Sequence, residues 1–116
     1  MNKLLYLSLF FIIISCSSEV QRVAEPDDLI PKDTMVLVLK DLMVLESHVK
    51  NKFPMVNQNY KLMRKSGDLI FKKYDIDTAR FDASMDYYGS RQEEMQEINS
   101  LILDKVNREL TELSAK

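Results

Sequence analysis

The residue with the most definite chemistry in this chain is Cys16, its only cysteine. A single thiol cannot form an internal disulfide, so its position has to indicate its role. Cys16 follows an apolar run from Leu4 to Ile14, which is interrupted only by Tyr6 and Ser8 and is preceded by Lys3. This run is far shorter than the ~20 residues that a spanning helix needs. A short basic start followed by a run of this length is typical of a secretory signal peptide.

The four residues Ile13-Ile14-Ser15-Cys16 resemble a bacterial lipobox, with aliphatic residues at −3 and −2 and a small residue at −1. In that chemistry the thiol accepts a diacylglycerol through a thioether, and a membrane protease cuts before the cysteine. Two or three acyl chains, at ~0.8 kcal/mol per buried CH₂, hold a protein stably on a membrane. We therefore expect residues 1–15 to be a cleaved lipoprotein signal peptide and Cys16 to be the lipidation site.

The residue after the cysteine bears on the membrane to which the chain is sorted. Ser17 stands where an Asp would retain some lipoproteins in the inner membrane. This favours a location in the bacterial cell envelope at the outer membrane, on its periplasmic face or its surface. Residues 16–31 then form the lipidated cysteine and a flexible tether, which reaches at most about 50 Å at ~3.3 Å per residue.

Other polar residues have spacings that fit a site poorly. His48 is the only histidine and lies seven residues after Asp41, whereas a metal site needs a tighter cluster. Four aspartates lie close together, but the places where a calcium loop needs Gly and Glu hold Arg80 and Asp86. We expect no catalytic residue, no metal and no cofactor, and we expect the protein not to be an enzyme. The four aspartates are Asp75, Asp77, Asp82 and Asp86.

The aromatic residues offer one weak candidate for a partner surface. Phe81 and Tyr88 share a helical face with the core, whereas Tyr87 points elsewhere and is the candidate residue for contact with another protein. The net charge of −2 argues against a nucleic-acid binder, which should present a basic face.

The pattern of apolar residues predicts an all-α domain over residues 32–116. Two glycines and three prolines leave few turns for a β fold. Apolar residues at helical spacing predict four helices, over about 33–51, 54–74, 77–89 and 90–114, in a small bundle whose neighbours pack antiparallel. The inner faces are expected to include Met35, Val38, Leu39, Met43, Val49, Leu69, Met95, Ile98, Ile102, Val106, Leu110 and Leu113.

Helix ends and one glycine add local detail. Asp33 and Asp77 are predicted N-caps of the first and third helices. Ser90-Arg91-Gln92-Glu93 is a predicted capping box for the last helix. Gly67, inside the second helix, indicates a close helix crossing or a bend.

These features resemble a family of small bacterial lipoproteins that is filed as a domain of unknown function. The residues that carry the resemblance are Leu29-Ile30-Pro31, Met35-Val36, Leu39, Asp41-Leu42, Glu46, Phe71-Lys72-Lys73-Tyr74, Ile76, Phe81, Ser84 and Tyr87-Tyr88. The chain departs from the family at Gly89-Ser90, where a proline is expected, and at the late position of His48. The resemblance covers roughly residues 25–112 and implies a helical fold in the envelope, with no established activity.

The sequence leaves two kinds of function open. The first is a membrane-anchored, non-enzymatic module that binds another protein or serves envelope assembly. The alternative is a periplasmic peptide-binding, ligand-binding or chaperone-like domain. The identity of the partner would separate them.

Overall fold

The computed structural model describes residues 21–52 and 56–116 of the chain, together with Lys3. The predictions for the lipobox and for a helix start at Pro54 therefore lie outside the described residues. In the described residues, four helices follow one another: α2 (Lys32–Lys52), α3 (Val56–Lys73), α4 (Thr78–Gly89) and α5 (Gln92–Ser114). The prediction of an all-α domain of four helices is confirmed.

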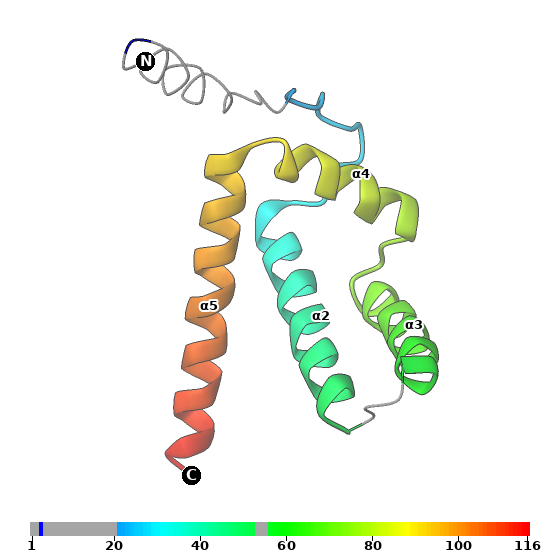
Figure 1. The fold of residues 1–116 in the computed structure, drawn as a ribbon, viewed down its shortest axis with the longest axis vertical. Coiled ribbons are helices and arrows are strands. Elements are labelled where there is room, and N and C mark those ends of the chain that lie inside the picture. Colours follow the sequence, from blue (N-terminus) through cyan, green and yellow to red (C-terminus); the bar gives the residue numbers. More distant parts are fainter. Residues whose placement is uncertain (1–2, 4–20, 53–55) are drawn as a thin grey trace.

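Helix α2 is the centre of the domain, because it packs against α3 on one side and α5 on the other (Figure 1). Helix α3 runs antiparallel to α2, as predicted, whereas α5 runs parallel to it. Two ion pairs record this parallel alignment: Lys32 Nζ lies 2.7 Å from Glu97, and Lys40 Nζ lies 2.6 Å from Glu109.

Helix α4 corrects the prediction that every neighbouring pair packs antiparallel. It crosses one end of the other three helices and contacts the start of α5 (Figure 1). With 12 residues it is only about 18 Å long, enough to bridge the domain but too short to run along α2. Because of this crossing, α5 begins at the same end of the domain as α2 and runs parallel to it.

The core gathers at the end of the domain that α4 covers. Its fully buried members come from α2, α5 and the segment before α2, and Tyr88 of α4 is 3% exposed. Phe71 and Phe81 pack beside it with ring centroids 4.9 Å apart. The buried core residues are Ile30, Met35, Val36, Val38, Ile76, Tyr88, Ile98 and Ile102.

Four residues predicted to face the core are exposed instead, among them Leu69 of α3, which is 61% exposed. Leu110 and Leu113 of α5 are 57% and 70% exposed, and Met43 of α2 is 50% exposed. Leu110 and Leu113 lie beyond the part of α5 that the core occupies, whereas Met43 is exposed in the middle of α2, between the buried residues Val38 and Val49. On α5, the prediction that the apolar stripe faces the core is confirmed as far as Val106 and is wrong for Leu110 and Leu113.

The helix ends agree only in part with the predicted caps. Helix α2 begins at Lys32, one residue before the predicted cap Asp33. The Asp77 carboxylate accepts a hydrogen bond from the Arg80 N–H at 2.8 Å, as predicted. The capping box at Ser90 is wrong, because Ser90 closes α4 in a helical conformation and its N–H bonds to Asp86 and Tyr88. Helix α5 starts after Arg91, without a side-chain cap.

The close helix crossing that the sequence suggested at Gly67 is wrong. A Cβ atom placed there meets nothing within 4 Å, so there is no close helix crossing at this position. We expect Gly67→Ala to raise the free energy of unfolding by about 0.5–1 kcal/mol, because alanine loses less backbone entropy in a helix interior. Urea denaturation would measure it. Gly89→Ala, at the end of α4 and equally unobstructed, is the control with a smaller expected gain.

Candidate functional site

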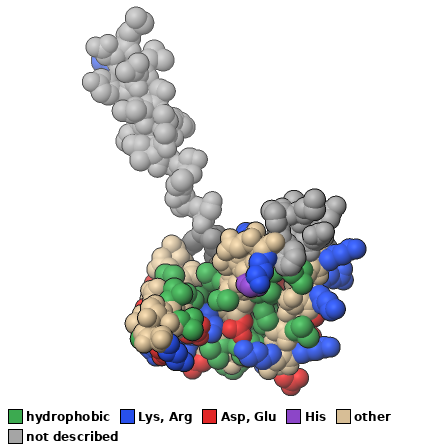
Figure 2. Space-filling view, turned by 90° about the horizontal axis from the view of Figure 1, so that it is seen from below, with side chains coloured by type: hydrophobic (Ala, Val, Ile, Leu, Met, Phe, Trp, Pro, Cys, Tyr) green, Lys and Arg blue, Asp and Glu red, His purple; other side chains and the backbone are tan. Residues whose placement is uncertain are grey.

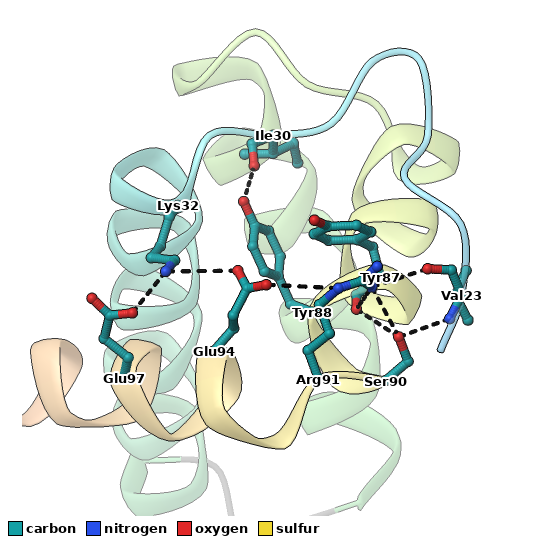
Figure 3. Close-up of polar contacts among 9 residues, drawn as sticks. All are labelled: Val23, Ile30, Lys32, Tyr87, Tyr88, Ser90, Arg91, Glu94 and Glu97. Atoms are coloured by element: carbon teal, nitrogen blue, oxygen red, sulfur yellow. Dashed lines mark hydrogen bonds and ion pairs between the residues drawn. The ribbon is translucent and has the colours of Figure 1, made fainter. Parts of the chain in front are cut away.

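The segment before α2, residues 23–31, lies against the helices, and we call it the strap. Its inner end is held by two buried hydrogen bonds. The Ile30 N–H donates to Ser84 Oγ at 3.0 Å. The Tyr88 hydroxyl donates to the Ile30 carbonyl at 2.7 Å, as Figure 3 shows. Ile30 is 0% exposed. Both polar groups of a buried backbone position are thus satisfied by α4 side chains, so this part of the strap is integral to the domain.

The outer end of the strap is held where α4 meets α5. The Val23 N–H donates to Ser90 Oγ at 2.9 Å, and Arg91 Nη1 donates to the Val23 carbonyl at 2.9 Å. The Arg91 guanidinium lies 3.7 Å from the centroid of the Tyr87 ring, a cation–π contact (Figure 3). Tyr87, the candidate partner residue, is half-buried with Arg91 over one face of its ring. In this structure its ring supports the residue that holds the strap.

A second polar cluster is centred on Asp41 of α2. The Asp41 carboxylate accepts hydrogen bonds from Lys73 Nζ at 2.7 Å and from the Tyr74 hydroxyl at 2.8 Å. Lys40 Nζ lies 3.4 Å from Asp41 and 2.6 Å from Glu109. This chain of charges connects α5, α2 and the end of α3.

The environment of Asp41 sets its protonation. Burial alone would raise the pKa of its carboxyl, but the hydrogen bonds from Lys73 and Tyr74 outweigh it and lower the pKa below its ordinary value of 3.8. Burial and the bond to Asp41 raise the pKa of Tyr74. Asp41 is therefore ionised near neutral pH and serves as the acceptor that ties α3 to α2.

We expect Asp41 to make stability depend on acid. Because its folded pKa is lower than its unfolded pKa, its contribution is fully present above the unfolded value and is lost as pH falls through the folded value. Asp41→Asn should cost about 1–2 kcal/mol at pH 7 and remove part of the decline in stability below about pH 4. Urea unfolding at pH 7 and pH 3 measures both effects. The exposed Asp82→Asn is the control, and an unchanged acid slope in Asp41→Asn would contradict the assignment.

Beside this cluster lies an open groove between α2 and α3, with a volume of about 470 Å³. We call it the α2–α3 groove. Its floor is apolar, and two of its residues, Val44 and Leu69, are 50% and 61% exposed. Asp41, His48 and Lys73 provide its polar edge. The complete lining is Asp41, Val44, Leu45, His48, Leu69, Ile70 and Lys73.

Of the remaining predicted polar residues, His48 lines the α2–α3 groove together with Asp41. His48 is exposed on α2, and the four aspartates from Asp75 to Asp86 are exposed around α4. Within the described ranges, no three His, Cys, Asp or Glu side chains gather as metal ligands would. No helix in the part of the chain described by the structure is long and apolar enough to cross a membrane.

These features define a small four-helix domain whose first helix is preceded by a docked strap. The family model described as "Domain of unknown function (DUF4296)" matches residues 26–116. The chain therefore belongs to this family, as the resemblance in its core residues implied. The match begins within the strap, in agreement with the burial of Ile30. Comparison with curated proteins and with solved structures gives no match.

Proposed function

We propose that this chain is a lipid-anchored protein of the bacterial cell envelope whose helical domain binds another protein and performs no catalysis. The observation that carries the anchor is the sequence Ile13-Ile14-Ser15-Cys16 behind a short apolar run. The binding role is supported by the α2–α3 groove, where apolar side chains stay exposed between two helices.

Because the strap is docked on the helices, only the residues before it can act as a spacer between the proposed anchor and the domain. If Cys16 carries the lipid and Val23 is held by Ser90 and Arg91, the spacer is residues 17–22. Six residues span at most about 20 Å, in place of the 50 Å expected from a free tether up to residue 31. The domain then stays close to the membrane, with the α4–α5 junction nearest to it.

The anchor is tested by replacing Cys16 with alanine. We expect the variant to lose incorporation of radiolabelled palmitate completely and to move from the membrane fraction to the soluble fraction. Ser17→Ala is the matched control and should keep both label and membrane association. Labelling that survives in Cys16→Ala would refute the lipid anchor.

The alternative function, a periplasmic peptide-binding or chaperone-like domain, is favoured by the same exposed apolar side chains. The two functions differ in their partners. Crosslinking in intact envelopes should give one stoichiometric partner for a dedicated interaction module. Many unfolded clients in place of one partner would support the chaperone-like alternative.

A further inference from the structure

We propose that the α2–α3 groove binds an acidic amphipathic helix of a partner protein. This inference rests on the proposed binding function and specifies the partner's chemistry. It is carried by three observations: the charge around the groove, the helical nature of both walls, and the position of the groove relative to the strap.

Charge is distributed very unevenly along the chain. Residues 48–73 contain seven Lys and Arg but only one acidic residue, whereas residues 74–116 contain ten acidic and five basic residues. All seven basic side chains are exposed, and Figure 2 shows Lys and Arg gathered on the α3 side of the domain. The seven are Lys50, Lys52, Lys61, Arg64, Lys65, Lys72 and Lys73.

Most of this charge has no counterpart within the described domain. Lys50 pairs with Glu46, and Lys73 pairs with Asp41. The other five, which come from the end of α2 and from α3, form no ion pair with any described carboxylate, and residues 53–60 contain no acidic residue. A surface of one sign beside an apolar groove favours a partner of opposite charge.

The walls of the groove determine the conformation of the occupant. Helices α2 and α3 use their backbone N–H and C=O groups internally, so the walls offer no backbone partners to an extended peptide. A segment that buries its backbone there has to satisfy its own hydrogen bonds, as a helix does. The α2 residues that line the groove, Asp41, Val44, Leu45 and His48, have the i, i+3, i+4, i+7 spacing of a face that contacts another helix.

The position of the basic surface favours a protein over the anchoring membrane. The strap joins the domain at the end covered by α4, whereas the basic surface extends along α3 toward the opposite end, where α2 ends and α3 begins (Figure 1). A spacer of residues 17–22 keeps the α4 end nearest to the lipid. The basic surface is then available to a partner located away from that membrane.

The test uses the full chain reconstituted in phosphatidylcholine nanodiscs and a labelled synthetic peptide. The peptide has about 18 residues, the length of α3, with leucine at every third or fourth position and glutamate on both flanks. Fluorescence anisotropy should show saturable binding that weakens at least tenfold between about 50 mM and 300 mM salt. A peptide with the same composition but a scrambled leucine order, and one with lysine in place of glutamate, should bind at least tenfold more weakly.

Substitutions distinguish the contribution of the groove to peptide binding from that of other exposed residues. Leu69→Ser should weaken binding of the acidic peptide about tenfold, and Lys65→Glu combined with Lys72→Glu should remove most of its salt dependence. Leu103→Ser on α5, 57% exposed, is the matched control and should change nothing. All of these positions are exposed, so thermal unfolding followed by circular dichroism should confirm an unchanged fold.

Two results of the binding measurements would overturn the proposal. One is equal binding by wild type and Leu69→Ser. The other is tight binding to phosphatidylglycerol vesicles that Leu69→Ser leaves unaltered while the acidic peptide fails to bind, which would assign the surface to anionic lipid. Repeating the titration with Cys16→Ala in solution, without nanodiscs, should give the same peptide affinity, so failure of the anchor is distinguished from failure of this inference. A single stoichiometric envelope partner without a groove-binding helix would refute only this inference.

Discussion

Replacing Ile30 with alanine is expected to lower the free energy of unfolding by about 2–5 kcal/mol. Ile30 precedes the first helix, yet it is fully buried in the core with Met35 and Tyr88. Alanine removes the buried side-chain atoms beyond Cβ and leaves a cavity in the core beneath α4. Because small domains are stable by only about 5–15 kcal/mol, this single change would remove a large fraction of the total.

The comparison that makes this result specific is the other end of the strap. Val23 is 42% exposed and is held through its backbone N–H and carbonyl, which alanine retains. Val23→Ala should therefore change stability by no more than about 0.5 kcal/mol. Urea denaturation of both variants measures the difference. A cost below about 1 kcal/mol for Ile30→Ala would mean that the strap adds little to the fold.

Helix positions were predictable because they depend on short-range features. The apolar repeat from Met35 to Val49, the cap at Asp77 and the stop at Gly89 each act over a few residues, and each agrees with the observed helices to within about two residues. The same local reasoning failed at Ser90. Its hydroxyl bonds to the N–H of Val23, which lies 67 residues away, and donates to the Tyr87 carbonyl. Local sequence could not reveal that competing partner.

Long-range arrangement was the part that the sequence could not provide. Nothing in the chain before α2 indicates that Ser84 and Tyr88 satisfy the backbone of Ile30, because those residues also suit an ordinary helix face. Likewise, the parallel packing of α5 on α2 follows from the crossing of α4, a tertiary feature. The sequence therefore predicted that the strap is part of a tether. The apolar pair Leu29-Ile30 was the one local feature indicating that this segment packs on the domain.

The basic surface beside the groove is visible in the sequence as a cluster of Lys and Arg, but the net charge of the whole chain hides it. The chain as a whole carries −2, but the basic residues concentrate between 48 and 73 and the acidic ones follow them. Counting charge by segment identifies the basic surface without a structure. The exposure of Leu69 and Val44 beside it needed the packing of α3 on α2, because both fit an apolar helical face.

Ile98 and Leu110 lie on the same predicted apolar stripe of α5, yet they differ in burial. Ile98 is 0% exposed between α2 and α4, whereas Leu110, three turns later, is 57% exposed. We expect Ile98→Ala to cost about 2–5 kcal/mol and Leu110→Ala to cost no more than about 0.5–1 kcal/mol. Periodicity alone assigns both residues to the core and predicts equal costs, so chemical denaturation of the two variants distinguishes the pattern from the packing.

The contrast follows from where α4 crosses the domain. Helix α5 is buried only while it runs beside the first half of α2 and under α4, and Lys40 meets Glu109 near the limit of that contact. Beyond it, leucine side chains already in water lose little when shortened. Equal destabilisation by both variants would mean that the end of α5 packs against another surface in solution. In that case a second copy of the chain would be the first partner to test, by measuring whether the stability of wild type depends on protein concentration.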